Sequence, residues 1–262
     1  MAAGNETPLD GPAGEALLAH FALRSGGASR PPFDSLNLGF SSGDRAQDVL
    51  ENRRRLARHL EVPLRRWVAA GQVHGAGMAV VLPADSGEGS TAPSRRLTGA
   101  DAIFLPRPGV FALSLGADCP LVVVADPGAR RAGVAHAGWR GTAEGVVEAL
   151  LGAFEEAGSR PEDLLAGVSP GICGDCYEVG EEVFAALRGR PGLREARRGS
   201  RLDLRSIHHR TLRDAGIPAA SITMSRKCSR SSREECFSVR RDGPRTGRNA
   251  ALVGFRGDPT RG

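Results

Sequence analysis

The sequence is poor in the residues on which several classes of protein depend. Its 262 residues include only 5 cysteines, 6 histidines, 2 tryptophans and 1 tyrosine. No apolar run reaches the roughly 18 residues of a transmembrane helix, and no basic segment followed by an apolar stretch opens the chain. We therefore expect neither a membrane span nor a signal peptide, and a cytoplasmic location. An odd number of cysteines in such a chain favours free thiols or metal ligands over a disulfide framework.

The positive charge of the chain is spread along it and does not form a nucleic-acid-binding motif. The formal net charge is +5 and the pI is about 9.4. The basic residues are almost all arginines scattered among alanine, glycine and proline, with no basic helix and no RNA-binding motif with interleaved aromatics. We expect no nucleic-acid partner, and a small anion such as phosphate suits these arginines better. GxxxxGK[ST] and strand–turn–helix GxGxxG loops are also absent.

Apolar periodicity predicts an α+β fold with mixed β-sheets flanked by helices. Short apolar runs bounded by glycine, proline and aspartate predict strands at 67–73, 78–83, 101–106, 110–115, 121–125, 132–137, 164–169 and 221–225. Helical spacing predicts helices at 44–62, 142–157, from about 179, and 204–215, the first of them capped by Asp44. The polar, Gly/Pro-rich segments predict tails at 1–14 and 257–262 around a domain of residues 15–256, a mobile loop at 83–96, and irregular chain after 225.

The stretch "GADCPLVVVADPGARRAGVAHAGWRG", residues 116–141, contains a cysteine and a histidine at the two ends of a predicted hairpin. If Ala125 pairs with Ala132 across the turn, Leu121 lies opposite His136, and Cys119 falls on the same face of the sheet. A packed cysteine, a Cys/His nucleophilic pair and part of a metal site all fit this placement.

A second histidine favours the metal site. His74 ends the predicted strand "AAGQV" and is followed by a glycine, which permits close approach of backbone or ligand. His74, Cys119 and His136 match the three protein ligands of an open catalytic zinc site, whereas a Cys/His dyad leaves His74 unexplained. Zinc lowers the pKa of a bound water to about 7 and keeps the cysteine as thiolate. Copper binds such sites more tightly than zinc and is the second candidate metal.

Residues 35–255 resemble a known family in seven stretches that occur in the same order. The stretches are "SLNLG", "NRRRL", "QVHG", "ADCP", "HAGWRG", "SPGICGDCYEVG" and "CFSVRRDGPRTGRNAAL". The chain resembles the YfiH family, long called multicopper polyphenol oxidases or laccases and later described as purine nucleoside phosphorylases and peptidoglycan editing factors. The resemblance implies a compact single α+β domain, with metal ligands at His74, Cys119 and His136. It also implies phosphorolysis of adenosine, inosine, guanosine or methylthioadenosine, and hydrolytic deamination of adenosine. Asn37 and Arg53 become candidate substrate-binding residues.

Phosphorolysis requires a phosphate held against the sugar, and therefore an arginine near the metal. Arg53 and Arg140 are the candidates, with surface solvation as the competing interpretation. Asp118 is a candidate proton carrier, although strand alternation is expected to turn it away from the site that Cys119 faces. We expect a purine nucleoside and phosphate as partners, and no protein partner.

The sequence departs from the family pattern at "SPGICGDCYEVG", where Cys173 and Cys176 form a C-x-x-C pair. Such a pair is either a structural part of a loop, redox-active, or a second metal site together with Cys228 and Cys236.

Three functions compete with the nucleoside enzyme. A multicopper oxidase centre needs about ten histidines, more than the 6 present, so it is excluded. An amidohydrolase acting on a peptidoglycan precursor would use the same metal, or Cys119 as nucleophile. A non-enzymatic metal-binding partner protein is disfavoured because structural zinc is normally closed by four ligands.

Overall fold

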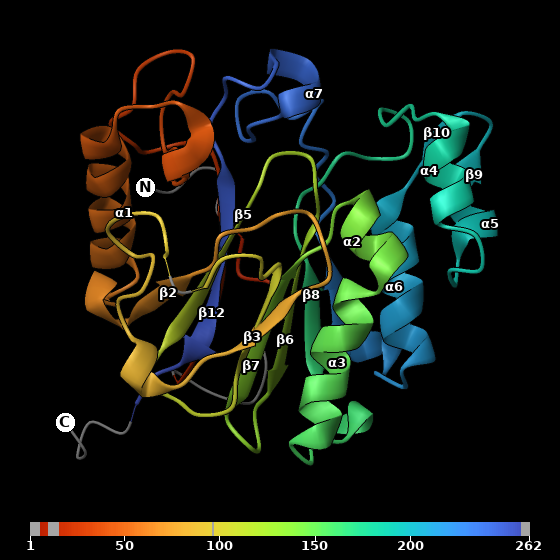
Figure 1. Ribbon diagram of the computed structural model, residues 1–262, viewed down its shortest axis with the longest axis horizontal. Helices are drawn as coiled ribbons and strands as arrows, with labels where there is room; N and C mark the ends of the chain where they lie inside the picture. Colours follow the sequence, from red (N-terminus) through yellow and green to blue (C-terminus); the bar gives the residue numbers. More distant parts are fainter. Residues whose placement is uncertain (1–5, 10–15, 96, 258–262) are drawn as a thin grey trace.

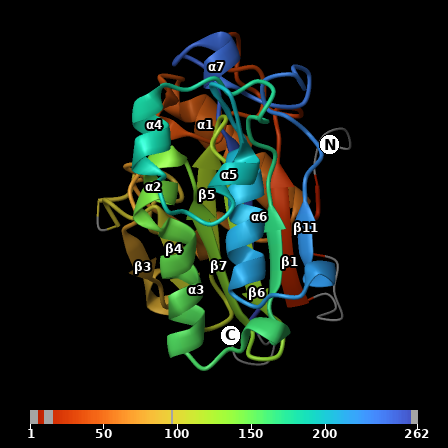
Figure 2. The same cartoon turned by 90° about the vertical axis from the view of Figure 1, so that its right-hand side faces the viewer.

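Two β-sheets pack face to face between helices in the computed structural model, which describes residues 6–9, 16–95 and 97–257. The smaller sheet has the order β1-β12-β5-β2 and the larger one β11-β8-β6-β7-β4-β3. Helix α1 covers the outer face of the smaller sheet, whereas α3 and α6 cover the larger (Figures 1 and 2). The single compact α+β domain predicted from the sequence is confirmed.

The elements have the following bounds. The strands are β1 Leu17–Ala22, β2 Trp67–Ala69, β3 Met78–Val80, β4 Ala102–Leu105, β5 Phe111–Gly116, β6 Leu121–Asp126, β7 Arg131–His136, β8 Leu165–Val168, β9 Arg197–Arg198, β10 Arg201–Leu202, β11 Ile222–Met224 and β12 Asn249–Phe255. The helices are α1 Ala46–His59, α2 Trp139–Glu144, α3 Val146–Glu156, α4 Glu181–Ala186, α5 Leu193–Ala196, α6 Leu204–Asp214 and α7 Val239–Asp242.

The larger sheet is buried on both faces, which explains its nearly continuous apolar strands. Leu121, Val123 and Ala125 of β6 pack into the core between the two sheets, whereas Val122 and Val124 pack against α3. A strand covered on both faces needs apolar residues at every position instead of alternate ones. The predicted register of β6 and β7 is confirmed, since Leu121 pairs with His136.

Two predictions about helices need correction. The segment 142–157 is two helices, because Gly145 adopts a left-handed φ of 88° between α2 and α3. Helix α1 starts after Arg45, and the Asp44 carboxylate accepts hydrogen bonds from Ser29, Asn37 and the Arg45 N–H without capping the helix. The helix expected from about residue 179 is present and begins at Glu181.

The chain after residue 225 is not irregular throughout. It contains β12, which pairs with β1 on one side and with β5 on the other. Residues 6–9 are also not a tail, because Glu6 forms a bridge with Phe21 and Leu9 is buried. The other positions of the predicted N-terminal tail, 1–5 and 10–14, lie outside the described residues. The predicted C-terminal tail also lies outside them, except for Gly257. None of the helices among the described residues is long and apolar enough to cross a membrane.

Candidate active site

The connection from β5 to β6 crosses between the two sheets at one end of the sandwich. Gly116 at the end of β5 pairs with Asn249 at the start of β12, and Leu121 at the start of β6 pairs with His136 at the end of β7. Cys119 lies in this connection. The segment that contains His74 follows β2, which runs parallel to β5 and therefore ends at the same edge.

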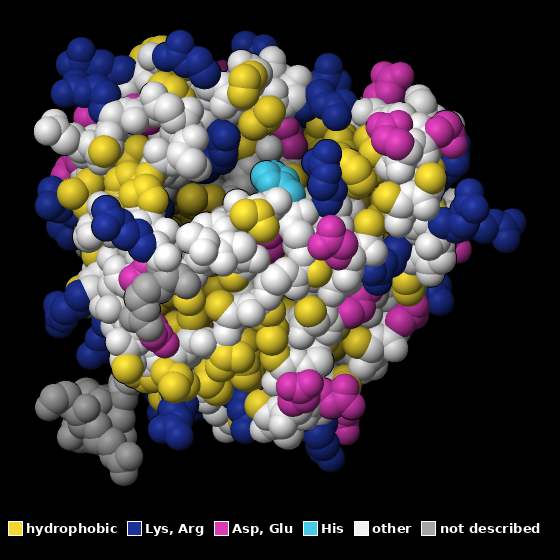
Figure 3. Space-filling view, in the orientation of Figure 1, with side chains coloured by type: hydrophobic (Ala, Val, Ile, Leu, Met, Phe, Trp, Pro, Cys, Tyr) yellow, Lys and Arg dark blue, Asp and Glu magenta, His cyan; other side chains and the backbone are white. Residues whose placement is uncertain are grey.

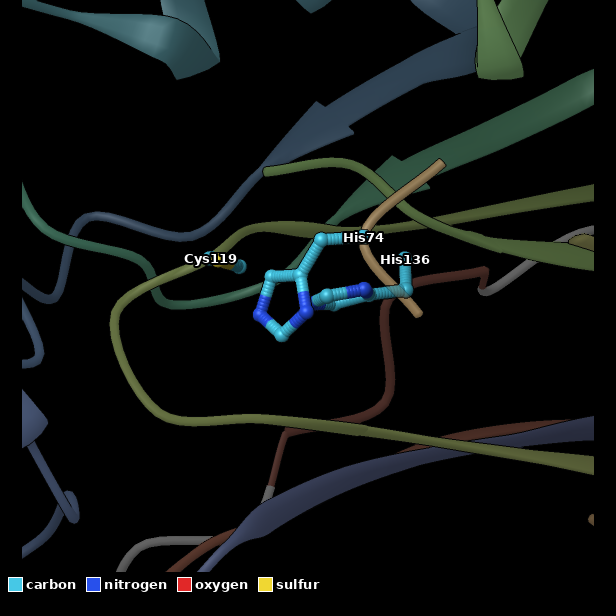
Figure 4. Close-up of side chains that lie close together, drawn as sticks. All are labelled: His74, Cys119 and His136. Carbon is cyan, nitrogen blue, oxygen red and sulfur yellow. The ribbon is translucent and has the colours of Figure 1, made fainter. Parts of the chain in front are cut away.

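Both sheets thus bring His74, Cys119 and His136 together, as the sequence predicted. One donor atom from each residue lies within 4.8 Å of the other two. The imidazole rings of His74 and His136 meet edge to face, with centroids 4.8 Å apart (Figure 4). His136 is buried, Cys119 is partly exposed and His74 is exposed, so the group is accessible from the His74 side.

A buried carboxylate that sequence reasoning missed holds both histidines. Oδ1 of Asp101 accepts hydrogen bonds from Nδ1 of His136 at 2.8 Å and from the backbone N–H of His74 at 3.0 Å. Oδ2 accepts from the N–H groups of Val73 at 3.0 Å and Gly75 at 2.9 Å. A proton on Nδ1 leaves Nε2 of His136 with its lone pair free for a metal ion. Asp101 therefore fixes both the ring of one histidine and the backbone of the other.

The backbone around His74 and Cys119 takes conformations that few residues adopt. His74 has a φ of 66° and Asp118 a φ of 91°, in the region that glycine favours. A Cβ atom on Gly138 would lie 2.8 Å from Sγ of Cys119, so the glycine after His136 leaves room for the thiol. Gly138 in "HAGWRG" thus permits a close approach of the thiol, whereas a Cβ atom on Gly75 in "QVHG" would lie 3.3 Å from Oε2 of Glu144.

Cys119 and His136 favour each other's charged forms. Burial opposes ionisation of the thiol, but the His136 imidazolium and the hydrogen bonds from both histidines lower the pKa of Cys119 to about 6. Burial also opposes protonation of His136, but the Cys119 thiolate and Asp101 raise its pKa to about 9. The thiol is therefore a thiolate near neutral pH, the form that binds a metal or acts as a nucleophile.

The three residues line a cavity of about 320 Å³, and Figure 3 shows a histidine exposed beside a hollow on this face. Apolar groups from β2 and β5 and the Phe40 ring contribute to its wall. Arg248 also lines it, held by hydrogen bonds from Nη1 to the carbonyls of Thr246 and Gly247. The volume lies in the usual range of small-molecule sites, about 300–1,000 Å³.

The candidate substrate-binding residues lie in different places. Arg53 lines the cavity, but its Nε and Nη1 donate to the carbonyls of Leu38, Gly89 and Ser90, and burial lowers its pKa to about 9. Asn37 is fully buried outside the cavity lining and accepts a hydrogen bond from the Arg248 N–H.

Arg140 and Asp118 lie outside the cavity wall. Arg140 is exposed, with its guanidinium 4.3 Å from the Trp139 ring centre. Asp118 accepts hydrogen bonds from the Ser229 hydroxyl and the Arg240 N–H, in agreement with the expectation that it turns away from the site.

A family model described as multi-copper polyphenol oxidoreductase laccase matches residues 18–256. The chain belongs to this family, the YfiH family. Purine nucleoside phosphorylase YlmD of Geobacillus stearothermophilus is 36% identical over 249 residues, which cover 91% of this chain and 90% of the relative. Adenosine deaminase RL5, from an unknown prokaryotic organism, is 34% identical over 232 residues, covering 84% and 86%. The crystal structure of the Bacillus licheniformis hypothetical protein YfiH matches with a TM-score of 0.87 at 33% identity, covering 92% and 93%.

Two residues of this YfiH-family site could have been found in the sequence. Asp101 is the first residue of the predicted strand "DAIFLP", and an aspartate at a strand end is a common position for a site residue. Arg248 stands in "GRNAAL", within a segment that the resemblance already covers. Neither residue has a local pattern that indicates its partners, because both act through contacts distant in the sequence.

Proposed function

We propose that this protein is a zinc-dependent enzyme acting on purine nucleosides, and that His74, Cys119 and His136 hold the metal. The observation that carries the proposal is that these three ligands lie together in the wall of one cavity. The names of the relatives, purine nucleoside phosphorylase and adenosine deaminase, support the substrate class.

The donor set fits zinc. Zn–N distances of about 2.0–2.1 Å and a Zn–S distance of about 2.3 Å require donors roughly 3.3–3.6 Å apart in a tetrahedral site. The donors here lie within 4.8 Å, so shifts of about 1 Å complete the geometry. Asp101 already supplies the carboxylate–histidine contact typical of zinc sites. Three protein ligands leave a fourth position for water or substrate, as in catalytic sites.

The surrounding residues suit the two reactions named for the relatives. Zinc would supply a Lewis acid and a water that ionises near pH 7. The apolar wall would accept a purine ring, and Arg248 would attract phosphate by charge-assisted hydrogen bonds. Arg53 would stabilise the wall, because three carbonyls already occupy its Nε and Nη1. We propose phosphorolysis of adenosine, inosine, guanosine or methylthioadenosine when phosphate is present, and deamination of adenosine to inosine.

Chromatography of adenosine reactions with and without phosphate tests the proposal. The expected products are adenine and ribose 1-phosphate only with phosphate, and inosine in either case. Cys119→Ala should lower turnover at least about 100-fold, because it removes a proposed ligand and not merely a residue that orients one. Cys236→Ala is the matched control, since Cys236 lies outside the metal-binding groups. Full activity of Cys119→Ala would refute the assignment.

Parallel assays separate the remaining functions. Activity on a peptidoglycan precursor with none on nucleosides would support the amidohydrolase. Metal binding with no turnover on either would support a non-enzymatic partner protein. The same preparations loaded with copper test whether copper replaces zinc in function or only occupies the site.

A further inference from the structure

Three cysteines lie together outside the candidate active site. The Sγ atoms of Cys173, Cys176 and Cys228 lie within 4.8 Å of one another, and all three cysteines are free thiols. Cys228 is buried, whereas Cys173 and Cys176 are partly exposed, so an ion can reach the cluster from solvent. Cys236 is fully buried and is not part of the group, so the predicted set of four cysteines is wrong in that member.

The local backbone aims the three sulfurs at one point. The N–H groups of Cys176 and Tyr177 both donate to the Cys173 carbonyl at 3.0 Å, which closes a tight turn across the C-x-x-C pair. Cys228 approaches from a different segment, after β11, which is a parallel neighbour of β8. The N–H of Cys173 donates to Sγ of Cys228 at 3.3 Å, a contact that stabilises a thiolate. The C-x-x-C pair and Cys228 therefore meet because they follow two neighbouring parallel strands.

The separation of the sulfurs is close to that in a metal–thiolate site. With metal–sulfur bonds of about 2.3 Å, a tetrahedral ion holds its sulfurs about 3.8 Å apart. The observed limit of 4.8 Å therefore needs a contraction of at most about 1 Å. No fourth histidine, cysteine or carboxylate of the described residues joins this group, which leaves one position for water or an external ligand.

We propose that Cys173, Cys176 and Cys228 form a second metal site, for a soft d¹⁰ cation such as zinc. Thiolates select such cations over magnesium or calcium, which prefer oxygen ligands. The bound ion would join the segment after β8 to the segment after β11, 55 residues apart in the sequence.

The second site would also support the candidate active site. The N–H of Ile172 donates to the carbonyl of Asp118 at 2.8 Å, and the hydroxyl of Ser229 donates to its carboxylate at 2.6 Å. Ile172 and Ser229 are each adjacent to a cysteine of the cluster, and Asp118 directly precedes Cys119. An ion that joins the two segments would hold the Cys119 backbone from both sides.

The test uses Cys119→Ala as background, so that no sulfur from the first site contributes. Zinc-loaded protein is desalted, its zinc content is measured, and X-ray absorption at the zinc edge counts the sulfur ligands. We expect about one zinc per chain with three sulfurs at about 2.3 Å. Adding Cys173→Ser should lower the zinc content to less than about one tenth, whereas adding Cys236→Ala should leave it unchanged. Cu⁺ loaded without oxygen forms a second arm, because it shares the preference for thiolates.

The outcomes decide the proposal independently of the nucleoside activity. Three-sulfur coordination of either cation that depends on Cys173 supports the site, and the arm that succeeds identifies the cation. The proposal would be overturned if Cys173→Ser left both the zinc and the Cu⁺ content unchanged, or if the reduced protein bound neither cation. A Cys173–Cys176 disulfide that forms in place of metal binding would also overturn it. If the Cys119→Ala protein does not fold, wild-type protein should bind two zinc ions with an average of two sulfurs each, and one sulfur would overturn the proposal.

Discussion

Replacing Asp101 by asparagine tests how the candidate active site is held together. Each carboxylate oxygen of Asp101 accepts two hydrogen bonds, one oxygen from His136 and His74 and the other from Val73 and Gly75. Asparagine keeps the size but replaces one oxygen by an NH₂ group, which donates and cannot accept. Whichever way the amide turns, two donors lose their acceptor.

The consequence is large in either orientation. If the NH₂ faces His136, Nδ1 must become the acceptor and the proton moves to Nε2, so the ring no longer presents its lone pair to a metal. If the NH₂ faces Val73 and Gly75, two partly buried backbone N–H groups lose their acceptor, and each loss costs less than the about 1–3 kcal/mol of a fully buried group. We therefore expect metal affinity to fall by about 10–100-fold and the free energy of unfolding by about 1–3 kcal/mol.

Competition with a chelator measures the affinity, and urea unfolding of metal-free protein measures the stability. Asp126→Asn is the matched control, because Asp126 is also a buried aspartate of the same sheet, but binds the Ala129 N–H and the Ser159 hydroxyl at the other end of β6. The control should lose stability and keep its metal affinity. An Asp101→Asn protein with wild-type affinity and stability would refute the reasoning.

Three further predictions follow from the same geometry. Gly138→Ala places a Cβ atom 2.8 Å from Sγ of Cys119 and should weaken metal binding at least about tenfold in the chelator assay, whereas Gly152→Ala, whose Cβ meets nothing within 4 Å, should not. Between pH 6 and 9 the Cys119 thiolate coexists with protonated His136, so each bound metal ion should displace one proton. Metal affinity should therefore rise about tenfold per pH unit in this range and level off above pH 9. Calorimetry in buffers of different ionisation enthalpy measures the protons released, and a count of zero would contradict the prediction. Burial lowers the pKa of His208 to about 4, so between pH 6.5 and 4 the unfolded chain binds a proton at this residue that the folded protein does not. The free energy of unfolding should therefore fall by about 3 kcal/mol from pH 6.5 to 4. Urea unfolding at several pH values should show a weaker pH dependence in His208→Gln than in the wild type.

Sequence patterns brought the three proposed ligands together because each of them lies at or beyond the end of an apolar strand. The β6 and β7 register places Leu121 opposite His136, and this pairing brings Cys119 to the same end of the sheet. The burial of both sheet faces made the strands recognisable as apolar runs. The prediction for His74 depended on a strand that extends to residue 73, whereas β2 ends at Ala69 and His74 lies in the following loop.

The remaining features depend on distant contacts or on weak local patterns. Strand β12 was missed because its small residues, such as Ala250 and Ala251, lack the β-branched character of typical strands. The sequence pattern predicts one helix across Gly145, because nothing nearby distinguishes an interior glycine from one that ends a helix. Asp101 was missed because its partners lie 26 to 35 residues away in the sequence.

The position of Cys119 depends on parts of the chain that follow all three proposed ligands. Asp118, the residue before it, is held by the N–H of Ile172 and by the hydroxyl of Ser229. Strand β12 lies between β1 and β5, and so supports the strand from which the Cys119 connection departs. The three ligands therefore acquire their geometry only when the C-terminal part of the chain has folded. Metal binding to the folded state must in turn stabilise that whole arrangement, because a ligand that binds only the native protein shifts the folding equilibrium towards it.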